Sequence, residues 1–182
     1  MRNRKTAMRW IVNYSVLGAL ITFTGAVFAQ TPPAAQPQFS DPFKYCAAIG
    51  TIDAPDGRYV GTAAPEAVIE DLKKKARLAD DAPADWVAAG TVWRCMDRKV
   101  WACFVGANLP CSEKANTSAI PQAAVRDFCK TNLNADIPTI VTGRATIYDW
   151  RCVNGTPQVS KKLFTPDAQG FLSNFWYELS SR

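Results

Sequence analysis

The sequence predicts an α+β domain: an antiparallel sheet of about five strands with two short helices, held together by disulfides. Three observations lead to this prediction. Six cysteines follow a leader-like segment, several β-rich runs are separated by turn-forming residues, and two segments have apolar residues at helical spacing. The chain has 182 residues, of which 48% are apolar and 20% charged, as in an ordinary globular domain.

Residues 1–29 have the three parts of a secretory signal peptide: a basic start, an apolar middle and a small-residue site at 27–29. We expect export by the general secretion route, cleavage after Ala29, and a periplasmic or secreted protein. The alternative is an uncleaved membrane anchor, which is disfavoured because polar residues at 13–15 interrupt the apolar run.

The rest of the chain is predicted to form a tether and one domain. Residues 30–40 are rich in Pro, Ala and Gln and predict a flexible tether, and residues 41–182 predict a single disulfide-stabilised domain. The net charge of +5 arises largely from residues 1–29, which contain four basic residues and no acidic one. The charge therefore gives no reason to expect nucleic acid as a partner.

The cysteines are expected to form three structural disulfides in an oxidising compartment. A metal or redox site is disfavoured because the chain has no histidine and no C-x-x-C motif. Fifteen pairings are possible. A Cys111–Cys129 bond is favoured because these two residues flank one loop-to-helix segment. The six are Cys46, Cys95, Cys103, Cys111, Cys129 and Cys152.

The first half of the domain is predicted to contain a strand, a helix and a hairpin. Tyr45–Ile52 is interpreted as a strand followed by a turn at 53–57, and the residues from Pro65 to Arg77 as a helix. Residues 79–90 are interpreted as a loop. Thr91–Phe104 alternates around Asp97-Arg98 and predicts a hairpin.

The register of that hairpin has a consequence for its two cysteines. A two-residue turn places Cys95 opposite Val100 and Cys103 opposite Val92. The two cysteines then lie on opposite faces of the hairpin, so they are not expected to bond each other.

The second half is predicted to be a short helix and a three-stranded meander. Pro121–Lys130 is the helix, and Thr139–Val153 the first strand, rich in β-branched and aromatic residues. Asn154-Gly155 is a strong turn signal. Residues 159–164 form the returning strand and residues 171–179 the third.

Several segments resemble a family of small exported bacterial proteins of unassigned function: CAAIGTIDAPDGRYVG, VWRCM, VGANLPC, VTGRAT and YDWRCVNG. The resemblance covers about residues 45–155. It implies a bacterial periplasmic or secreted location and no particular activity. The hairpin at 150–155 is also similar to a Tyr-x-Cys-x-x-Gly strand of periplasmic lysozyme inhibitors, whose Ser-Gly-rich inhibitory loop has no clear counterpart here.

Aromatic and arginine residues supply the candidate partner-binding residues. Trp93 and Arg94 are neighbours on one strand and therefore face opposite sides, as do Trp150 and Arg151. Large side chains left at the surface often anchor partners. The alternative is a helix-covered sheet with a rim of aromatic residues. The candidates are Trp93, Arg94, Arg144, Trp150, Arg151 and Trp176.

Catalysis is the second hypothesis. Without histidine, two carboxylates could still hydrolyse a glycan of the cell envelope, and the candidate pairs are Asp53 with Asp56, and Asp149 with Glu178. An enzyme should have a pocket with converging carboxylates of raised pKa. A binding protein should instead have an exposed patch of aromatic and arginine side chains.

The sequence therefore favours an exported, non-catalytic binding or interaction module without cofactor or metal. Its partner is expected to be another envelope protein, a secreted enzyme or a cell-wall component. We expect contact with a membrane only through the leader, if that stays uncleaved. The alternatives are the carboxylate-dependent hydrolase and an inhibitor of a secreted, lysozyme-type enzyme.

Overall fold

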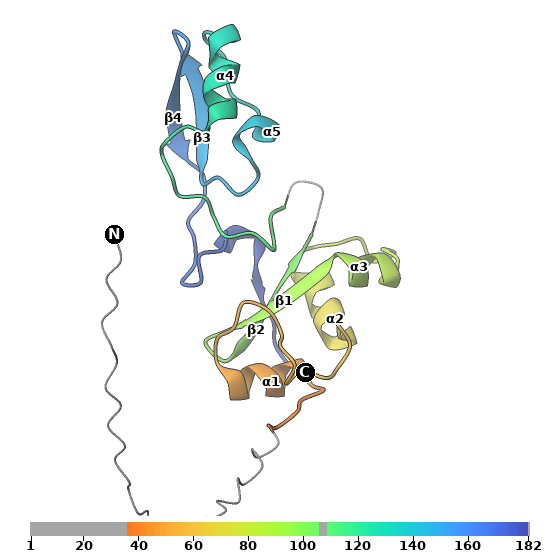
Figure 1. Ribbon diagram of the computed structural model, residues 1–182. Helices are drawn as coiled ribbons and strands as arrows, with labels where there is room; N and C mark the ends of the chain where they lie inside the picture. The colour runs from red at the N-terminus through yellow and green to blue at the C-terminus, as the bar shows by residue number, and fades with distance from the viewer. Residues whose placement is uncertain (1–35, 106–108, 182) are drawn as a thin grey trace, which may run out of the picture. The chain divides into compact units, whose positions relative to one another are not determined.

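The computed structural model describes residues 36–105 and 109–181 (Figure 1). The predicted signal peptide and residues 30–35 of the predicted tether lie outside the described residues. Pairing begins slightly before residue 41: the Phe39 N–H donates to the Arg58 carbonyl and the Val60 N–H donates to the Phe39 carbonyl, each at 2.8 Å.

The first sheet is antiparallel, with strand order β1-β2-β5. Its strands are β1 (Thr91–Met96), β2 (Lys99–Phe104) and β5 (Tyr177–Glu178). The predicted hairpin register is confirmed, because Cys95 is opposite Val100 and Cys103 is opposite Val92. Both residues of the connecting turn, Asp97 and Arg98, have positive φ, which gives the twist that a two-residue hairpin needs.

Three helices pack with one face of this sheet: α1 (Pro42–Ile49), α2 (Glu66–Lys75) and α3 (Ala84–Gly90). Figure 1 shows them gathered around β1 and β2. The helix predicted from Pro65 is confirmed as α2, and its Val68 and Leu72 are fully buried. Because burial of apolar side chains is the main favourable term in folding, this core holds the helices to the sheet.

The strand predicted at Tyr45–Ile52 is wrong, since these residues mostly belong to helix α1. The Asp41 carboxylate caps the helix by accepting from the N–H groups of Phe43 and Lys44, at 2.8 and 3.0 Å. Pro42 suits the first turn, because its missing N–H would have no partner there. The predicted loop at 79–90 also contains helix α3.

The second sheet is the hairpin of β3 (Tyr148–Val153) and β4 (Thr156–Lys162). The predicted Asn154-Gly155 turn is confirmed, with φ of 48° and 78°. Helix α4 (Ala123–Thr131), predicted from the sequence, packs here together with the short α5 (Thr139–Thr142). The small core between them is formed by Val125, Cys129, Ile137, Trp150 and Cys152.

The predicted three-stranded meander is wrong. Thr139–Val153 is not one strand: α5 follows Pro138, and Gly143 has φ 85° before the chain continues to β3. Residues 171–179 contain a short 3-10 helix, η1 (Ser173–Phe175), and β5 pairs with β2 in the other sheet. Within residues 36–105 and 109–181, the five strands thus form a three-stranded and a two-stranded sheet, with four helices of seven or more residues.

Three disulfides are confirmed: Cys46–Cys95, Cys103–Cys111 and Cys129–Cys152. The favoured Cys111–Cys129 pair is wrong. Cys129 lies on the inner face of α4 against β3, where Cys152 is its neighbour, whereas Cys111 packs in a different cluster with Cys103. The bonds indicate an oxidising extracellular or periplasmic compartment. No helix among the described residues is long and apolar enough to cross a membrane.

We expect protease digestion of the unreduced protein to release three disulfide-linked peptide pairs that match these bonds. Mass spectrometry before and after reduction identifies them, and thiol titration of the unreduced, unfolded protein should detect no free cysteine. A peptide joining Cys111 to Cys129 would contradict this pairing.

Candidate functional site

The candidate site follows from the way β1 is paired at its outer edge. Cys95 and Ile52 exchange two backbone hydrogen bonds there, of 3.0 and 3.1 Å. If that pairing continued, Ala54 would lie opposite Trp93. The chain instead bends at Asp53 and Ala54. Two cavities open beside this part of β1, and both are lined by Ala54, Val92 and Trp93. Together we call them the β1 cleft.

The larger part, the Tyr59 cavity, has a volume of about 450 Å³. The Tyr59 ring lies edge-on to Trp93, with ring centroids 4.8 Å apart, and both pack with the core under helices α1–α3. The Trp93 indole N–H donates to the Ala63 carbonyl at 2.8 Å, which fixes the indole. The lining residues are Ala54, Pro55, Asp56, Tyr59, Gly61, Ala63, Thr91, Val92 and Trp93.

The smaller part, the Phe171 cavity, has a volume of about 270 Å³. Phe171 and Trp176 form its aromatic wall, with ring centroids 5.4 Å apart. They belong to the cluster of Val92 and Cys103, whose side chains project from the opposite face of the sheet to Trp93. The two cavities thus lie on opposite faces of the sheet. The lining residues here are Asp53, Ala54, Val92, Trp93, Cys111, Ser112, Lys114, Phe171 and Trp176.

A buried arginine supports the aromatic wall. The Arg94 side chain is fully buried and donates to the Asp167 carboxylate and the Gln169 side-chain carbonyl. Its guanidinium carbon lies 4.4 and 4.2 Å from the ring centroids of Phe171 and Trp176, which is cation–π geometry. Burial lowers the pKa of Arg94, and the hydrogen bond and negative charge of Asp167 oppose that shift. This cluster attaches residues 167–176 to the sheet.

The charges at the rim of the Phe171 cavity are paired with each other. Lys114 Nζ lies 2.5 Å from an Asp53 oxygen and 3.9 Å from the Phe171 ring centroid. The Gln169 amide donates to the other Asp53 oxygen at 2.7 Å. Asp53 therefore has two partners, and the rim has a cation beside an anion.

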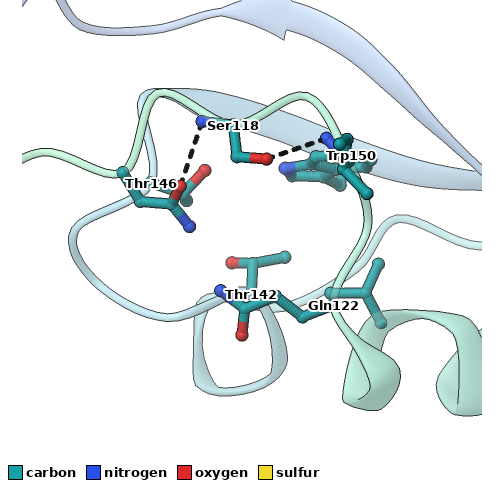
Figure 2. Close-up of a pocket in the computed structure, with 8 residues that line it drawn as sticks. Ser118, Gln122, Thr142, Thr146 and Trp150 are labelled. Atoms are coloured by element: carbon teal, nitrogen blue, oxygen red, sulfur yellow. Dashed lines mark hydrogen bonds between the residues drawn. The ribbon is translucent and has the colours of Figure 1, made fainter.

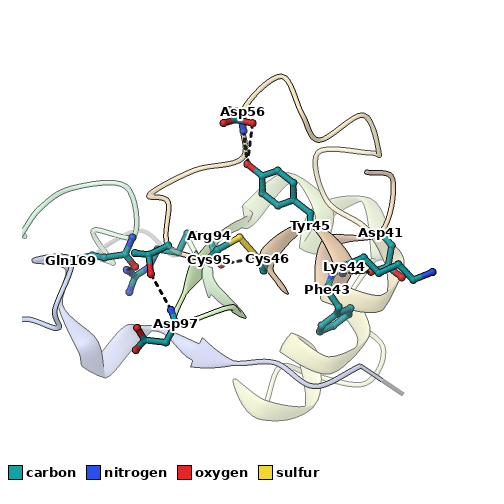
Figure 3. Close-up of a disulfide and its surroundings, with 11 residues drawn as sticks. Asp41, Phe43, Lys44, Tyr45, Cys46, Asp56, Arg94, Cys95, Asp97 and Gln169 are labelled. Atoms are coloured by element: carbon teal, nitrogen blue, oxygen red, sulfur yellow. Dashed lines mark hydrogen bonds between the residues drawn. A yellow bond between two sulfur atoms is a disulfide. The ribbon is translucent and has the colours of Figure 1, made fainter. Parts of the chain in front are cut away.

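Asp56, in the Tyr59 cavity, also has partners of its own. Its carboxylate accepts from Arg58 Nε at 3.0 Å. It also accepts from the Tyr45 hydroxyl at 3.2 Å, and Figure 3 shows these two side chains together. Hydrogen bonds from the Arg58 side chain are the main cause that lowers the pKa of Asp56 from 3.8 to about 2. A general acid needs the opposite shift, so this carboxylate is poorly suited to protonate a substrate.

The predicted partner-binding residues do not form one exposed face. Trp93, Arg94, Trp150 and Trp176 are buried, whereas Arg144 and Arg151 are exposed. The exposed face predicted from them is therefore wrong, because alternate residues of β1 are covered on both sides. Trp93 and Trp176 nevertheless line the β1 cleft, and Arg94 lies behind its wall. Trp150 and Arg151 belong to the second sheet.

The predicted carboxylate pairs are not brought together as catalytic pairs. Asp53 and Asp56 line different cavities and each has its own cationic partner. Asp149 and Glu178 lie in strands of different sheets, so they are not cross-strand neighbours as expected. Glu178 instead pairs with Lys99, at 2.8 Å.

Sequence reasoning missed the residues that shape the cleft: Ala54, Tyr59, Lys114 and Phe171. One signal was present, because residues 53–57 were predicted as a turn. The sequence did not reveal that this turn comes directly after the Ile52–Cys95 bridge to β1, so that the next part of the β1 edge is left uncovered. That step requires long-range pairing that the sequence does not encode locally.

A second, smaller pocket lies near β3 (Figure 2). Its volume of about 10 Å³ suits a single water molecule. Hydroxyl and amide groups line it, including those of Ser118, Gln122, Thr142 and Thr146, beside the Trp150 ring. This pocket is too small for an organic ligand, so the β1 cleft remains the candidate site.

No group of three or more Cys, Asp or Glu residues in the described part of the chain is placed to hold a metal ion. Comparison with protein-family models, with curated proteins and with solved structures gives no match. The resemblance to small exported bacterial proteins therefore stays a prediction. The site must be interpreted from its own geometry.

Replacing Asp167 with Asn should destabilise the protein by about 3–5 kcal/mol, because the buried Arg94 charge would lose its counter-ion. The substitution keeps the oxygen that accepts from the N–H groups of Gln169 and Phe171, so charge loss is the main change. Urea unfolding at neutral pH measures the effect. Asp127→Asn, in an exposed ion pair with Lys130, is the control and should cost about 1 kcal/mol or less.

Asp56 should contribute a pH-dependent part of the stability. Its pKa in the folded protein, about 2, lies below the ordinary value of 3.8, so the contribution is present above about pH 4 and is lost as the pH falls toward 2. Urea midpoints measured between pH 5 and 2 should therefore fall less steeply for Asp56→Asn. In the Arg58→Gln variant, the pKa of Asp56 should rise toward 3.8, which NMR titration of its carboxyl carbon measures. An unchanged pKa would contradict the assigned cause.

Proposed function

We propose that the protein is an exported binding module that holds its ligand in the β1 cleft. The observation that supports this proposal is the pair of cavities that share Ala54, Val92 and Trp93. A ligand that lies across the β1 edge contacts both. The larger cavity, of about 450 Å³, is within the usual size range of ligand pockets.

The chemistry of the cleft favours binding over hydrolysis. Most of its wall is aromatic or aliphatic, from Tyr59, Trp93, Phe171 and Trp176 among others. Its two carboxylates are held by Arg58 and Lys114. Hydrolysis by two carboxylates would need one of them to hold a proton near neutral pH, and the low pKa of Asp56 argues against that role.

The expected setting is the bacterial cell envelope. Three disulfides suit an oxidising compartment, and the leader predicts export. Among the partners predicted from the sequence, we favour another envelope protein over a cell-wall glycan or a secreted enzyme. The apolar walls of the cleft suit side chains of a polypeptide, whereas a glycan would need many unpaired polar groups.

Photo-crosslinking tests this function. The photoreactive residue p-benzoyl-phenylalanine replaces Ala54, which is exposed and lines both cavities. Irradiation of the exported protein in cells of its own source should give an adduct at this position, and mass spectrometry should identify the attached molecule.

The matched control carries the same residue at Ala124, an exposed position on α4 that lines neither cavity. An adduct at position 54 at least five times as abundant as at position 124 supports a ligand in the cleft. Equal labelling at the two positions, or none at either, contradicts it.

A further inference from the structure

We propose that the β1 cleft binds an extended peptide, which adds as a strand to the open edge of β1. This inference rests on the proposed function and specifies its ligand. It depends on the backbone groups of Trp93, on the placement of the two cavities, and on the charges that line them.

The first step is the direction of the backbone groups along β1. Gly90 bonds to Val105 on the β2 side, and Cys95 bonds to Ile52 on the outer side. Hydrogen-bonding direction alternates along a strand, so the N–H and C=O of Trp93 point outward, like those of Cys95. No described residue bonds to either group. Trp93 therefore presents one donor and one acceptor toward the cleft.

The second step is the missing neighbour. In the register of the Ile52–Cys95 bridge, Ala54 would exchange two hydrogen bonds with Trp93. The chain bends at Asp53 and Ala54, so Ala54 does not occupy that place and the two bonds are not formed. A residue of an added antiparallel strand fits the vacated place and would form the same two bonds, which is how peptides commonly join an exposed sheet edge.

The third step is the position of the cavities. Side chains of a strand alternate between the two faces of its sheet. The Tyr59 cavity lies on the face covered by helices α1–α3, and the Phe171 cavity lies on the opposite face. An added strand would therefore place successive side chains in alternate cavities. A compact small molecule would have no reason to use both faces.

Charge complementarity indicates which side chains fit. The charged groups that line the cleft are already paired: Asp56 with Arg58, and Asp53 with Lys114. A charged side chain entering either cavity would lose water without gaining an unpaired counter-charge among the described residues. The ligand is therefore a peptide with uncharged, mainly apolar or aromatic side chains at alternate positions.

Peptide selection provides the test. A phage-displayed library of random linear heptapeptides is selected on the exported, oxidised protein. Phage that also bind the Ala54→Arg variant are removed. The larger side chain should block the vacated place, whereas Ala124→Arg is the matched control. We expect enriched sequences with alternating apolar residues, bound at least tenfold more weakly by Ala54→Arg and within twofold by Ala124→Arg.

Synthetic peptides with blocked ends then test the strand geometry. On binding, the Trp93 amide proton should shift downfield in the NMR spectrum and exchange with solvent at least tenfold more slowly. Methylation of the peptide nitrogen that faces Trp93 should weaken binding at least tenfold, and methylation of the next nitrogen should change it less than twofold.

Three results would overturn the proposal. One is a selection that yields no peptide that prefers the unsubstituted protein to the Ala54→Arg variant. Another is a peptide that binds but does not slow exchange of the Trp93 amide proton with solvent. The third is that the selected peptide binds a shortened chain that begins at Gln36 but does not bind the longer exported chain. The segment before Gln36 would then occupy the edge of β1 in the longer chain. If the crosslink at position 54 still forms, the cleft binds a ligand of another kind and only the strand geometry fails.

Discussion

The pairing of Ile52 with Cys95 is the contact on which the architecture of the cleft depends. Cys95 is bonded to Cys46 on helix α1 through sulfur and to Ile52 through its backbone. These bonds hold the segment from 46 to 52 against β1 and fix the point at which the chain leaves it. The turn at 53–57 can then open the next stretch of the edge without disturbing the sheet.

A second constraint acts on the opposite face of the sheet. The buried Arg94 gathers Asp167, Gln169, Phe171 and Trp176 around it. A buried cation is costly without a partner, so the fold must bring the segment around Asp167 to this place. The same segment supplies one wall of the cleft. A stabilising cluster and one wall of the cleft are thus built from the same residues.

The sequence predicted features that depend on near neighbours. Asn154-Gly155 and Asp97-Arg98 could be predicted as turns because their geometry is local, and the register of β1 with β2 followed from the turn. Helix α1 was missed because its short apolar run resembles a strand, although the cap at Asp41 followed by Pro42 was visible. The partner of β5 and the pairing of Cys111 could not be predicted, since both depend on contacts between distant segments. The site was missed for the same reason. Alternation along the strand predicts that Trp93 and Arg94 lie on opposite faces, but it does not predict which segments cover each face.

The Cys46–Cys95 bond also makes the stability of the fold around the cleft depend on the redox environment. In the chain-entropy view, closing a loop of 49 residues stabilises the folded state by about 4 kcal/mol, a large share of the stability of a small domain. A newly made chain in a reducing cytosol lacks this support at the residue that adjoins the cleft. The fold around the cleft therefore reaches its full stability only in a compartment where this disulfide can form.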